Sequence, residues 1–449
     1  MPHQLHAYQT HAVSHLHARP RAGLFLDMGL GKTAVVLSAL KPEHLPVLVV
    51  APKRPTTMVW PEEAGIWRPD LSIAVATGSP AQRLKALRSS ADIVVIGRDV
   101  IDDANDKEFG GKFKTLVLDE LSGFKNRQSA RFKSAVEIIN RGMPYVWGLT
   151  GTPTPNGLLD LWAQMCLLDG GLRLGWNITA FRKEFFTIGR QLPNGVVISY
   201  DLIPGAEATI HEVLSDICLG MTSETYLELP DMIENTVEVP LTGEAKRMYR
   251  EMKRDYVTTY KGRQFYAPSA AALSGKLSQI VGGFIYHNDD NDTLAAGDGS
   301  YSVIHNEKVK ALQEIIDGTG TPVIVFYRYT AEKEMILTAL GKGAFTTDTP
   351  DLQARWNAGE LPVLVAHPQS IGHGLNLQKG PGHTMVWYNL PWGHEEFSQS
   401  NKRLQRQGQK HVVMQHRLIT PKTIDPLILI ALNEKRSVEQ ALMEYLERS

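Results

Sequence analysis

A short stretch near the N-terminus, residues 27–33 (Asp-Met-Gly-Leu-Gly-Lys-Thr), has the residue types and spacing of a phosphate-binding loop. It follows an apolar run that favours a strand and precedes a helical run. Gly29 and Gly31 let backbone N–H groups wrap around phosphate oxygens at the positive end of a helix. In such a loop Lys32 reaches the β- and γ-phosphates of a nucleotide, and Thr33 coordinates Mg²⁺.

Two adjacent carboxylates, Asp119 and Glu120, end another apolar run. At the tip of a buried strand, Asp119 is placed to hold Mg²⁺, and Glu120 is placed to orient or deprotonate an attacking water. A strand that ends in solvated acids is a common alternative, but the phosphate loop earlier in the chain favours catalysis. The sequence therefore predicts a site for ATP and Mg²⁺, with Thr33 and Asp119 as the metal ligands.

A third group of polar residues lies near the C-terminus, where Gln399, Arg403 and Arg406 recur at helical spacing. A helix over residues 395–405 is expected to present the two arginines on one face, where both could point at a γ-phosphate. Residues 402–417 contain five Lys or Arg and no acid. A solvated basic face is the alternative interpretation of this segment.

Composition limits the class of protein that holds these groups. The chain has 449 residues, 43% apolar and 21% charged, which is typical of a soluble globular protein and excludes a disordered or fibrous one. The two cysteines have no Cys-x-x-Cys spacing, so a disulfide framework and a thiolate zinc site are both excluded. No secretion signal and no membrane-length apolar run is present, and a cytoplasmic protein is expected. The net charge of −1 requires that any nucleic-acid surface be local.

The elements that must position these groups follow a βα rhythm over residues 20–165, and the rhythm returns after residue 305. The apolar runs lack polar alternation, as strands buried on both faces do, which predicts an α/β fold with two parallel-sheet lobes. The expected strands are 24–26, 47–51, 93–97, 116–119, 145–150, 323–327, 363–367, 385–388 and 412–419. The expected helices include 81–87, 129–139, 307–316, 331–340, 395–405 and 438–447.

The chain is expected to divide into three parts. Residues 1–170 form the first lobe and residues 305–449 the second, and residues 171–304 form a mainly helical middle region. An Asn-Gly pair at residues 194–195 indicates a hairpin within the middle region. Residues 287–302 form an acidic, turn-rich segment that fails the calcium-loop pattern, so a solvated loop is expected there.

The order of these motifs resembles that of a superfamily 2 helicase motor, and within that group the Swi/Snf family of DNA translocases. The match extends from about residue 5 to residue 430, interrupted by the middle region. It rests on residues 5–9, 27–33, 51–53 with Trp60, 119–120, 149–153 with Asn156, 374–377, 403–409 and 417–425. The resemblance implies two RecA-like lobes with ATP held between them.

The same resemblance implies roles for further residues. Gln9 would read the adenine, and Gly374 would contribute to the nucleotide site. Lys32, Thr33, Asp119 and Glu120 would act from the first lobe, and Arg403 and Arg406 from the second. The implied contacts to nucleic acid are Lys53, Arg54, Arg98, Lys125, Thr152, Arg328 and Asn376, and such contacts position a protein without reading sequence. Residues 124–134, with four cations and no acid, are expected to form a local basic patch.

One departure from the family pattern matters for function. Where the family has Asp-Glu-Ala-His, this chain has Asp119, Glu120, Leu121 and Ser122. Both acids remain, so we expect the loss of the histidine to alter coupling between nucleotide and DNA rather than Mg²⁺ chemistry.

The expected function is that of an ATP-driven DNA translocase, a DNA-dependent ATPase that moves on duplex DNA. The resemblance to compact members from bacteria and their phages implies a monomer with a role in DNA replication, recombination or repair, in a bacterium or an infected host cell. A strand-separating helicase on DNA or RNA is the enzymatic alternative. A switch that binds ATP and nucleic acid but turns over poorly is the alternative of another class.

Overall fold

The computed structural model describes residues 4–155, 157–189, 191, 195, 197, 199–227, 229–287, 300–371 and 375–434. The chain divides into two compact units, Met1–Leu227 and Glu228–Ser449. Each unit is built on its own parallel sheet, so the predicted fold class is confirmed. Among the described residues, no helix has both the length and the apolar character that crossing a bilayer requires.

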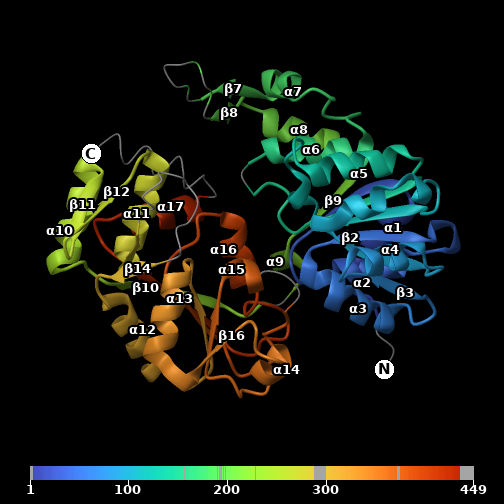
Figure 1. The fold of residues 1–449 in the computed structure, drawn as a ribbon. Helices are drawn as coiled ribbons and strands as arrows, with labels where there is room; N and C mark the ends of the chain where they lie inside the picture. Colours follow the sequence, from blue (N-terminus) through green and yellow to red (C-terminus); the bar gives the residue numbers. More distant parts are fainter. Residues whose placement is uncertain are drawn as a thin grey trace. The chain divides into compact units, whose positions relative to one another are not determined.

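The first unit is organised around a seven-stranded sheet with the order β3-β4-β2-β5-β6-β1-β9 (Figure 1). All neighbouring strands run parallel. The strands are β1 (Arg21–Leu26), β2 (Val47–Ala51), β3 (Ile73–Ala76), β4 (Ile93–Gly97), β5 (Thr115–Asp119), β6 (Tyr145–Leu149) and β9 (Cys218–Met221). Every residue of β2 is buried, as its uninterrupted apolar sequence predicts.

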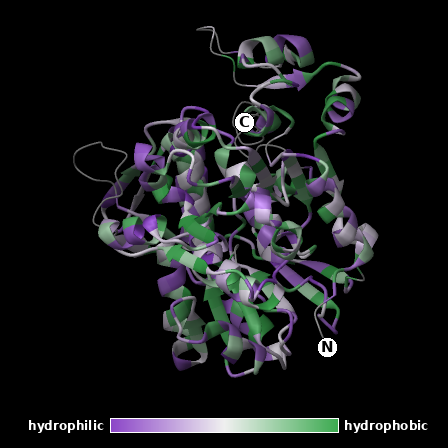
Figure 2. Cartoon of the chain, turned by 90° about the vertical axis from the view of Figure 1, so that its right-hand side faces the viewer, coloured by the Kyte–Doolittle hydropathy of each residue, from purple (hydrophilic) through white to green (hydrophobic). Residues whose placement is uncertain are grey.

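Helices cover this sheet and connect its strands. They are α1 (Ala7–His17), α2 (Lys32–Ala39), α3 (Trp60–Trp67), α4 (Pro80–Arg88), α5 (Ala130–Asn140), α6 (Leu159–Asp169), α7 (Ile178–Phe185), α8 (Ala206–Leu214) and α9 (Ser223–Tyr226). Short helical turns are η1 (Pro42–His44), η2 (Pro55–Val59), η3 (Arg98–Asn105), η4 (Lys107–Phe109) and η5 (Leu121–Phe124). Figure 2 shows hydrophilic residues beside hydrophobic ones along many helices, as expected where one helical face packs on a sheet.

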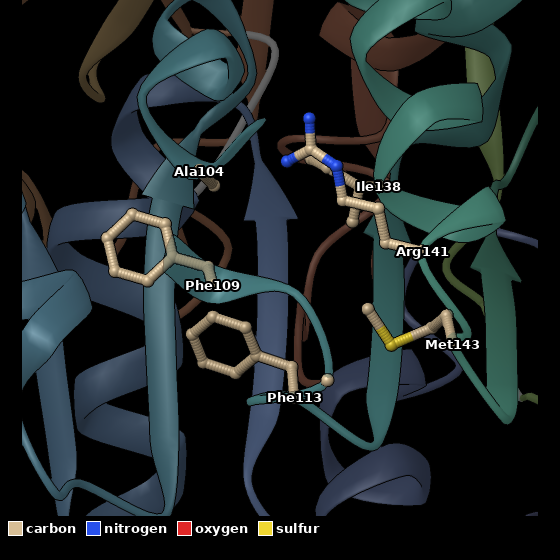
Figure 3. Close-up of a pocket in the computed structure, with 7 residues that line it drawn as sticks. Ala104, Phe109, Phe113, Ile138, Arg141 and Met143 are labelled. Carbon is tan, nitrogen blue, oxygen red and sulfur yellow. The ribbon is translucent and has the colours of Figure 1, made fainter. Parts of the chain in front are cut away.

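A small pocket of the first unit shows how η4 and α5 pack together (Figure 3). Phe109 and Phe113 line it together with Ile138 and Met143. Arg141 also lines this pocket, and its guanidinium donates to the backbone carbonyl of Asn105. The pocket is therefore a small gap in the packing of the first unit, and the polar group of Arg141 is hydrogen-bonded within the chain.

The hairpin predicted from the Asn-Gly pair is confirmed. Strands β7 (Phe186–Ile188) and β8 (Tyr200–Leu202) pair in antiparallel register, and Gln191 bridges to Val197. Of the Asn-Gly pair itself, Asn194 lies outside the described residues, and Gly195 has a φ of 86°.

The second unit contains a six-stranded parallel sheet with the order β10-β19-β18-β15-β17-β16. Its strands are β10 (Met232–Glu238), β15 (Val323–Phe326), β16 (Ala344–Thr346), β17 (Val363–Ala366), β18 (Thr384–Trp387) and β19 (Val413–Ile419). Its helices are α10 (Gly243–Asp255), α11 (Ala270–Gly282), α12 (Glu307–Gly318), α13 (Thr330–Leu340), η6 (Gly341–Gly343), α14 (Leu352–Asn357), α15 (Pro368–Ile371), α16 (His394–Asn401) and α17 (Asp425–Asn433). Two antiparallel pairs complete it, β11 (Val257–Tyr260) with β12 (Arg263–Tyr266) and β13 (Phe284–Tyr286) with β14 (Tyr301–Val303).

The segment expected to be a separate middle region contributes a strand to each sheet. Strand β9 pairs with β1 in the first unit, and β10 pairs with β19 in the second. The three-part division at residues 170 and 304 remains a prediction beside the two units that the structure resolves. The core of the acidic segment, residues 288–299, lies outside the described residues.

The helix predicted over residues 395–405 ends early, and this prediction was wrong for residues 402–405. Helix α16 stops at Asn401, and the following backbone bonds tighten to three-residue spacing, such as Leu404 N to Asn401 O at 3.3 Å. The Asn401 side chain is buried and accepts a hydrogen bond from the Trp387 indole at 3.0 Å, which fixes the helix end against β18. Arg403 and Arg406 therefore lie on the turns after α16. The helix predicted over 438–447 lies outside the described residues.

Candidate active site

The phosphate loop of the first unit joins the end of β1 to the start of α2. Gly29 and Gly31 have φ angles of 88° and 73°, values that L side chains rarely adopt. A Cβ at Gly31 would also collide with the side-chain amide of Gln9. The residue that precedes α2 is Gly31, which has no side chain with which to cap the helix. Only glycine fits this path of the chain.

Helix α1 brings Gln9 to the same loop. Gln9 is 6% exposed, and its Nε2 donates to the backbone oxygen of Leu30 at 3.1 Å. Its Oε1 accepts from the backbone N–H of His6 at 2.9 Å, which orients the amide group. The structure thus places Gln9 against the loop that the sequence assigned to nucleotide binding.

Lys32 lies at the centre of the loop. Its Nζ donates to the backbone oxygen of Leu26 at 2.8 Å, and a Cβ at Gly151 would lie 3.4 Å from it. Gly151 belongs to the turn after β6, and β6 lies between β1 and β5 in the sheet. The ends of β1 and β6, two neighbouring parallel strands, therefore meet at Lys32.

Asp119 and Glu120 occupy the end of β5, in two different environments. Burial raises the pKa of Asp119 to about 6, while the Trp60 indole, which donates to Asp119 Oδ2 at 3.0 Å, opposes this increase. Glu120 is 8% exposed, and its φ of 59° is left-handed. Its Oε1 accepts from the hydroxyls of Ser122 at 2.8 Å and Thr150 at 2.7 Å. These two hydroxyls fix the direction of the Glu120 carboxylate.

These residues fit a nucleotide and its magnesium ion. The glycine backbone and the uncapped helix offer N–H donors to phosphate, and Lys32 offers a cation. The Thr33 hydroxyl and the Asp119 carboxylate are oxygen ligands of the type that Mg²⁺ prefers. A divalent cation would also favour the ionised form of Asp119, which burial disfavours.

One residue of this region was missed by sequence reasoning. Ser223, at the start of α9 and 2% exposed, donates its hydroxyl to Asp27 Oδ2 at 2.6 Å. Asp27 is the first residue of the phosphate loop, and its Oδ1 accepts from Met28 N at 2.8 Å. No local pattern could have revealed this contact, because the two residues are 196 positions apart.

In the second unit, the structure brings the two arginines to the segment that follows the undescribed residues 372–374. Arg403 is 5% exposed and donates through Nη1 to the backbone oxygen of Leu375 at 3.1 Å. Arg406 donates through Nη1 to Asn376 Oδ1 at 2.8 Å. Two residues expected to act on the nucleotide thus lie beside one expected to contact nucleic acid. Gly374 lies outside the described residues. The burial of Arg403 argues against a solvated basic face at this position.

The residues expected to contact nucleic acid fall into two groups, one in each unit. In the first unit, Lys53 is exposed after β2, and Arg98 lies beside Gly123 on η5. The hydroxyl oxygen of Thr152 is buried without a hydrogen-bond partner among the described residues.

In the second unit, the guanidinium of Arg328 lies 4.0 Å from the ring centre of Trp392. Arg54 is half-buried at the start of η2, and Asn376 is held as described above.

The expected basic patch of residues 124–134 carries less unpaired positive charge than its sequence alone indicates. Lys125 lies 3.6 Å from Asp160, and Arg131 lies 3.3 Å from Asp99. Both acids come from outside the segment, so the local sequence could not reveal them. Two of the four cations are therefore paired, and Arg127 and Lys133 carry the remaining positive charge.

Comparison with known proteins decides the family. A family described as the SNF2-related domain matches residues 8–280, more than half of the chain. The chain belongs to the SNF2-related family. The family predicted from the motifs, a Swi/Snf-type member of superfamily 2, is thereby confirmed, and so at this level is the predicted class of DNA-dependent ATPase.

Relatives of this SNF2-related chain differ in length. Protein p41 of Acyrthosiphon pisum secondary endosymbiont phage 1 is 31% identical, with 98% of each chain covered. A Bacillus subtilis protein named as an ATP-dependent helicase/translocase, YwqA, is 25% identical over 93% of this chain and 46% of its own length. The SNF2 transcription regulatory protein of Saccharomyces cerevisiae is 25% identical, and the chain spans 26% of it. A solved Sulfolobus solfataricus SWI2/SNF2 ATPase core in complex with dsDNA is 24% identical, with a TM-score of 0.45, and covers 100% of this chain and 96% of its own.

The SNF2-related chain departs from its family at Ser122, and the structure shows what the serine does. Its hydroxyl donates to Glu120 in a position that is 1% exposed. The departure therefore keeps a hydrogen-bonding group next to the second acid of the pair.

Proposed function

We propose that this SNF2-related chain is an ATP-driven translocase that acts on double-stranded DNA. The observation that carries the proposal is the position of Lys32 after β1 and of Asp119 and Glu120 at the end of β5, the two strands that flank β6 in the first unit. Because these strands run parallel, both groups lie at the same edge of the sheet, where one ligand can contact them. Phosphate, a metal ion and an attacking water require this combination of groups.

Each residue has a separate task in this proposal. Lys32 and the backbone of the phosphate loop bind the β- and γ-phosphates of ATP, and Gln9 orients the adenine. Mg²⁺, when held by Thr33 and Asp119, neutralises charge on the phosphates. Glu120 orients the attacking water and accepts its proton, with Ser122 and Thr150 fixing its direction.

The arginines of the second unit complete the proposed chemistry. We assign Arg403 and Arg406 to stabilisation of negative charge on the γ-phosphate, a task worth roughly 10³–10⁵ in rate in other nucleotide hydrolases. Their present contacts with Leu375 and Asn376 link them to a segment assigned to DNA. Hydrolysis and DNA binding would then share residues in the second unit.

The contacts with DNA are proposed to be phosphate contacts. Such contacts do not depend on sequence, which suits an enzyme that moves along DNA. We assign this role to Lys53, Arg54, Arg98, Lys125, Thr152, Arg328 and Asn376. A phage protein among the relatives supports a role in phage or bacterial DNA replication, recombination or repair, in a bacterial or infected cell. We further propose that the chain acts as a monomer.

The deciding experiment is steady-state ATP hydrolysis by the wild type and by Glu120→Gln. It is measured with no nucleic acid, with duplex DNA, with single-stranded DNA and with RNA. We expect stimulation by duplex DNA that Glu120→Gln abolishes. Glu207→Gln, the same change at an exposed position on α8, is the control and should behave as wild type.

Other outcomes identify other functions. Stimulation by single strands or RNA alone would assign a strand-separating helicase instead. Little turnover under every condition, with ATP and DNA still bound, would assign a nucleotide-dependent switch. Either result would overturn the proposed translocase.

A further inference from the structure

A cavity of about 320 Å³ lies in the first unit, between α5 and the segment that follows α6. Its floor is apolar and consists of Phe132, Val136 and Cys166. Its other lining residues include Arg127 and Lys133, the two cations of the basic segment without an ion pair in the described chain. The volume is at the lower end of the range for sites that bind small ring systems. None of the groups assigned above to ATP lines it.

Trp176 provides a flat, open side to this cavity. Its side chain is 61% exposed, although it is a large aromatic residue. The indole lies against Gly170 and Gly171, and a Cβ at Gly171 would be 3.0 Å from the ring. Both glycines have positive φ angles, 72° and 78°. The chain is thus built so that one face of the indole packs on backbone while solvent reaches the ring.

Arg127 is fixed beside this ring by two contacts. Its Nη1 donates to the backbone oxygen of Trp176 at 3.2 Å, and its guanidinium lies 5.4 Å from the ring centre of the buried Trp162. Lys133 is exposed on the adjacent turn of α5. Glu137 also lines the cavity, and its carboxylate accepts from Asn105 Nδ2 at 2.6 Å. A hydrogen-bonded cation, an exposed cation and an aromatic side chain therefore line the same cavity.

We propose that this cavity binds an unpaired nucleobase of DNA, stacked on Trp176, with Arg127 and Lys133 contacting its flanking phosphates. Aromatic faces combined with cations along a groove are the means by which proteins hold unpaired nucleotides. An acidic peptide would use the same cations, but the width and exposure of the indole favour a planar base. The inference rests on the proposed action on DNA and extends it, because tracking along paired DNA needs no such pocket. The chain would then prefer gapped or frayed DNA.

The test compares two labelled DNAs by fluorescence anisotropy, a fully paired duplex and the same duplex with a short gap. Trp176→Ala should weaken binding to the gapped DNA about 5- to 150-fold, the range for one lost base stack, and change binding to the paired duplex less than about twofold. Trp176→Phe should retain most of the preference because it keeps an aromatic face. Leu172→Ala, which alters a side chain that is 79% exposed on the same segment, is the matched control and should bind both DNAs as wild type does.

A second measurement places the base directly. With 2-aminopurine in the gap, binding of the wild type should quench its fluorescence, and Trp176→Ala should remove the quenching. Equal affinity of the wild type for the two DNAs, equal losses on both in Trp176→Ala, or competition by a short acidic peptide but not by single-stranded DNA would each overturn the inference. Lys133→Ala, on an exposed position, gives an independent variant and should weaken gapped-DNA binding more than paired-DNA binding.

The failures of the two proposals are distinguishable. If the wild type shows no duplex-stimulated ATP hydrolysis, the proposed translocase is wrong, and the preference for gapped DNA can still be measured by anisotropy. Duplex-stimulated hydrolysis without any gap preference would sink the pocket alone. Thermal melting of each variant identifies a substitution that acts by unfolding the chain. If Trp176→Ala is unfolded, binding of Trp176→Phe and Lys133→Ala to the two DNAs tests the pocket instead.

Discussion

The direction of the Glu120 carboxylate is set by backbone and hydroxyls together. The residue adopts a left-handed φ of 59°, which a non-glycine residue keeps only where its surroundings compensate the strain. Ser122 and Thr150 both donate to the same oxygen, Oε1, and so hold the side chain in one orientation. The strain and these contacts occur at the residue to which we assign the general base.

Removing the Ser122 hydroxyl should therefore affect catalysis more than binding. For Ser122→Ala we expect kcat to fall about tenfold, because a hydrogen bond to a charged group is worth about 1.5–3 kcal/mol and Thr150 retains its own. KM for ATP should change less than about twofold, and both constants come from steady-state ATP hydrolysis. An unchanged kcat would show that Ser122 does not orient Glu120.

The family's histidine can be restored at the same position. In Ser122→His an imidazole N–H replaces the hydroxyl as the donor to Glu120, so we expect hydrolysis without DNA to stay near the wild-type rate and stimulation by duplex DNA to increase. A titration of ATP hydrolysis with duplex DNA measures the ratio of the DNA-stimulated rate to the rate without DNA. If stimulation stays the same, the departure at Ser122 does not explain the coupling.

At the scale of elements, the sequence predicted central strands better than edge strands. The predicted strands β2 and β4 agree residue for residue, because strands buried on both faces have uninterrupted apolar sequences. The four unpredicted sheet strands, β3, β9, β10 and β16, are the edges of the two sheets. β10, for example, has no buried residue, so its sequence lacks the apolar pattern.

The candidate site was predictable to a similar extent. Lys32 and Glu120 could each be assigned from a short local motif, because backbone geometry fixes the arrangement of neighbouring residues. Ser223 and the acids that pair with Lys125 and Arg131 could not, because only the fold brings them close. Arg403 was predicted on a helix, but the tertiary contact of Asn401 ends that helix two residues earlier, and no local pattern indicated its contact with Leu375.

A buried ion pair connects three elements of the second unit. Lys308 on α12 is fully buried, and its Nζ lies 2.8 Å from Asp425 at the start of α17 and 2.9 Å from Asn389 Oδ1 after β18. We expect Lys308→Ala to lower the free energy of unfolding by about 3–5 kcal/mol, because it leaves a carboxylate buried without its partner. Chemical denaturation measures this loss.

The matched control lies two residues away. Lys310 pairs with Glu307 at 2.9 Å but is exposed, so Lys310→Ala should cost less than about 1 kcal/mol. Equal effects of the two changes would contradict the role assigned to the buried pair. Replacing both Lys308 and Asp425 with apolar residues should recover part of the loss.

Helix α11 carries a lysine that should make stability depend on alkaline pH. Burial lowers the pKa of Lys276 to about 8, and its Nζ donates to the backbone oxygen of Tyr286 at 2.7 Å. Between pH 8 and the ordinary lysine pKa near 10.5, the unfolded chain binds more protons than the folded one, so this group makes stability rise with pH. Below pH 8 both states are protonated, and the full penalty of burying the charge remains.

Lys276→Met should remove this contribution. We expect the difference in free energy of unfolding between the variant and wild type to shrink by up to about 3 kcal/mol from pH 7.5 to pH 10.5. Denaturation series at matched pH values measure it, and the difference cancels all other titrating groups. A difference that stays constant with pH would show that Lys276 keeps the ordinary lysine pKa in the folded chain, as a hydrated ammonium group does.

For the whole molecule, a net charge of −1 means that attraction to DNA must come from a few local cations. Each lysine or arginine that neutralises a phosphate releases counterions, so affinity falls with salt at a slope of about 0.9 per contact. The proposed contacts can therefore be counted one at a time.

We expect Lys53→Ala to reduce the magnitude of the slope of log K against log salt on duplex DNA by about 0.9. Affinity at low salt should fall to a similar degree for any DNA sequence. Lys85→Ala, an exposed change on α4, is the control and should leave the slope as it is. An unchanged slope in Lys53→Ala would remove Lys53 from the interface.

The position of β9 has a consequence for how the protein is made. This strand closes the edge of β1, with Gly23 N bonded to Ile217 O at 3.0 Å and Asp27 N bonded to Met221 O at 2.9 Å. The ribosome completes β1 long before it reaches β9, a delay of roughly 10 to 40 s at usual rates of synthesis. Throughout that interval the strand that leads into the phosphate loop has an open edge, which is a template for pairing with foreign strands. The nascent chain, rather than the finished enzyme, is therefore the stage most exposed to aggregation and most dependent on chaperones.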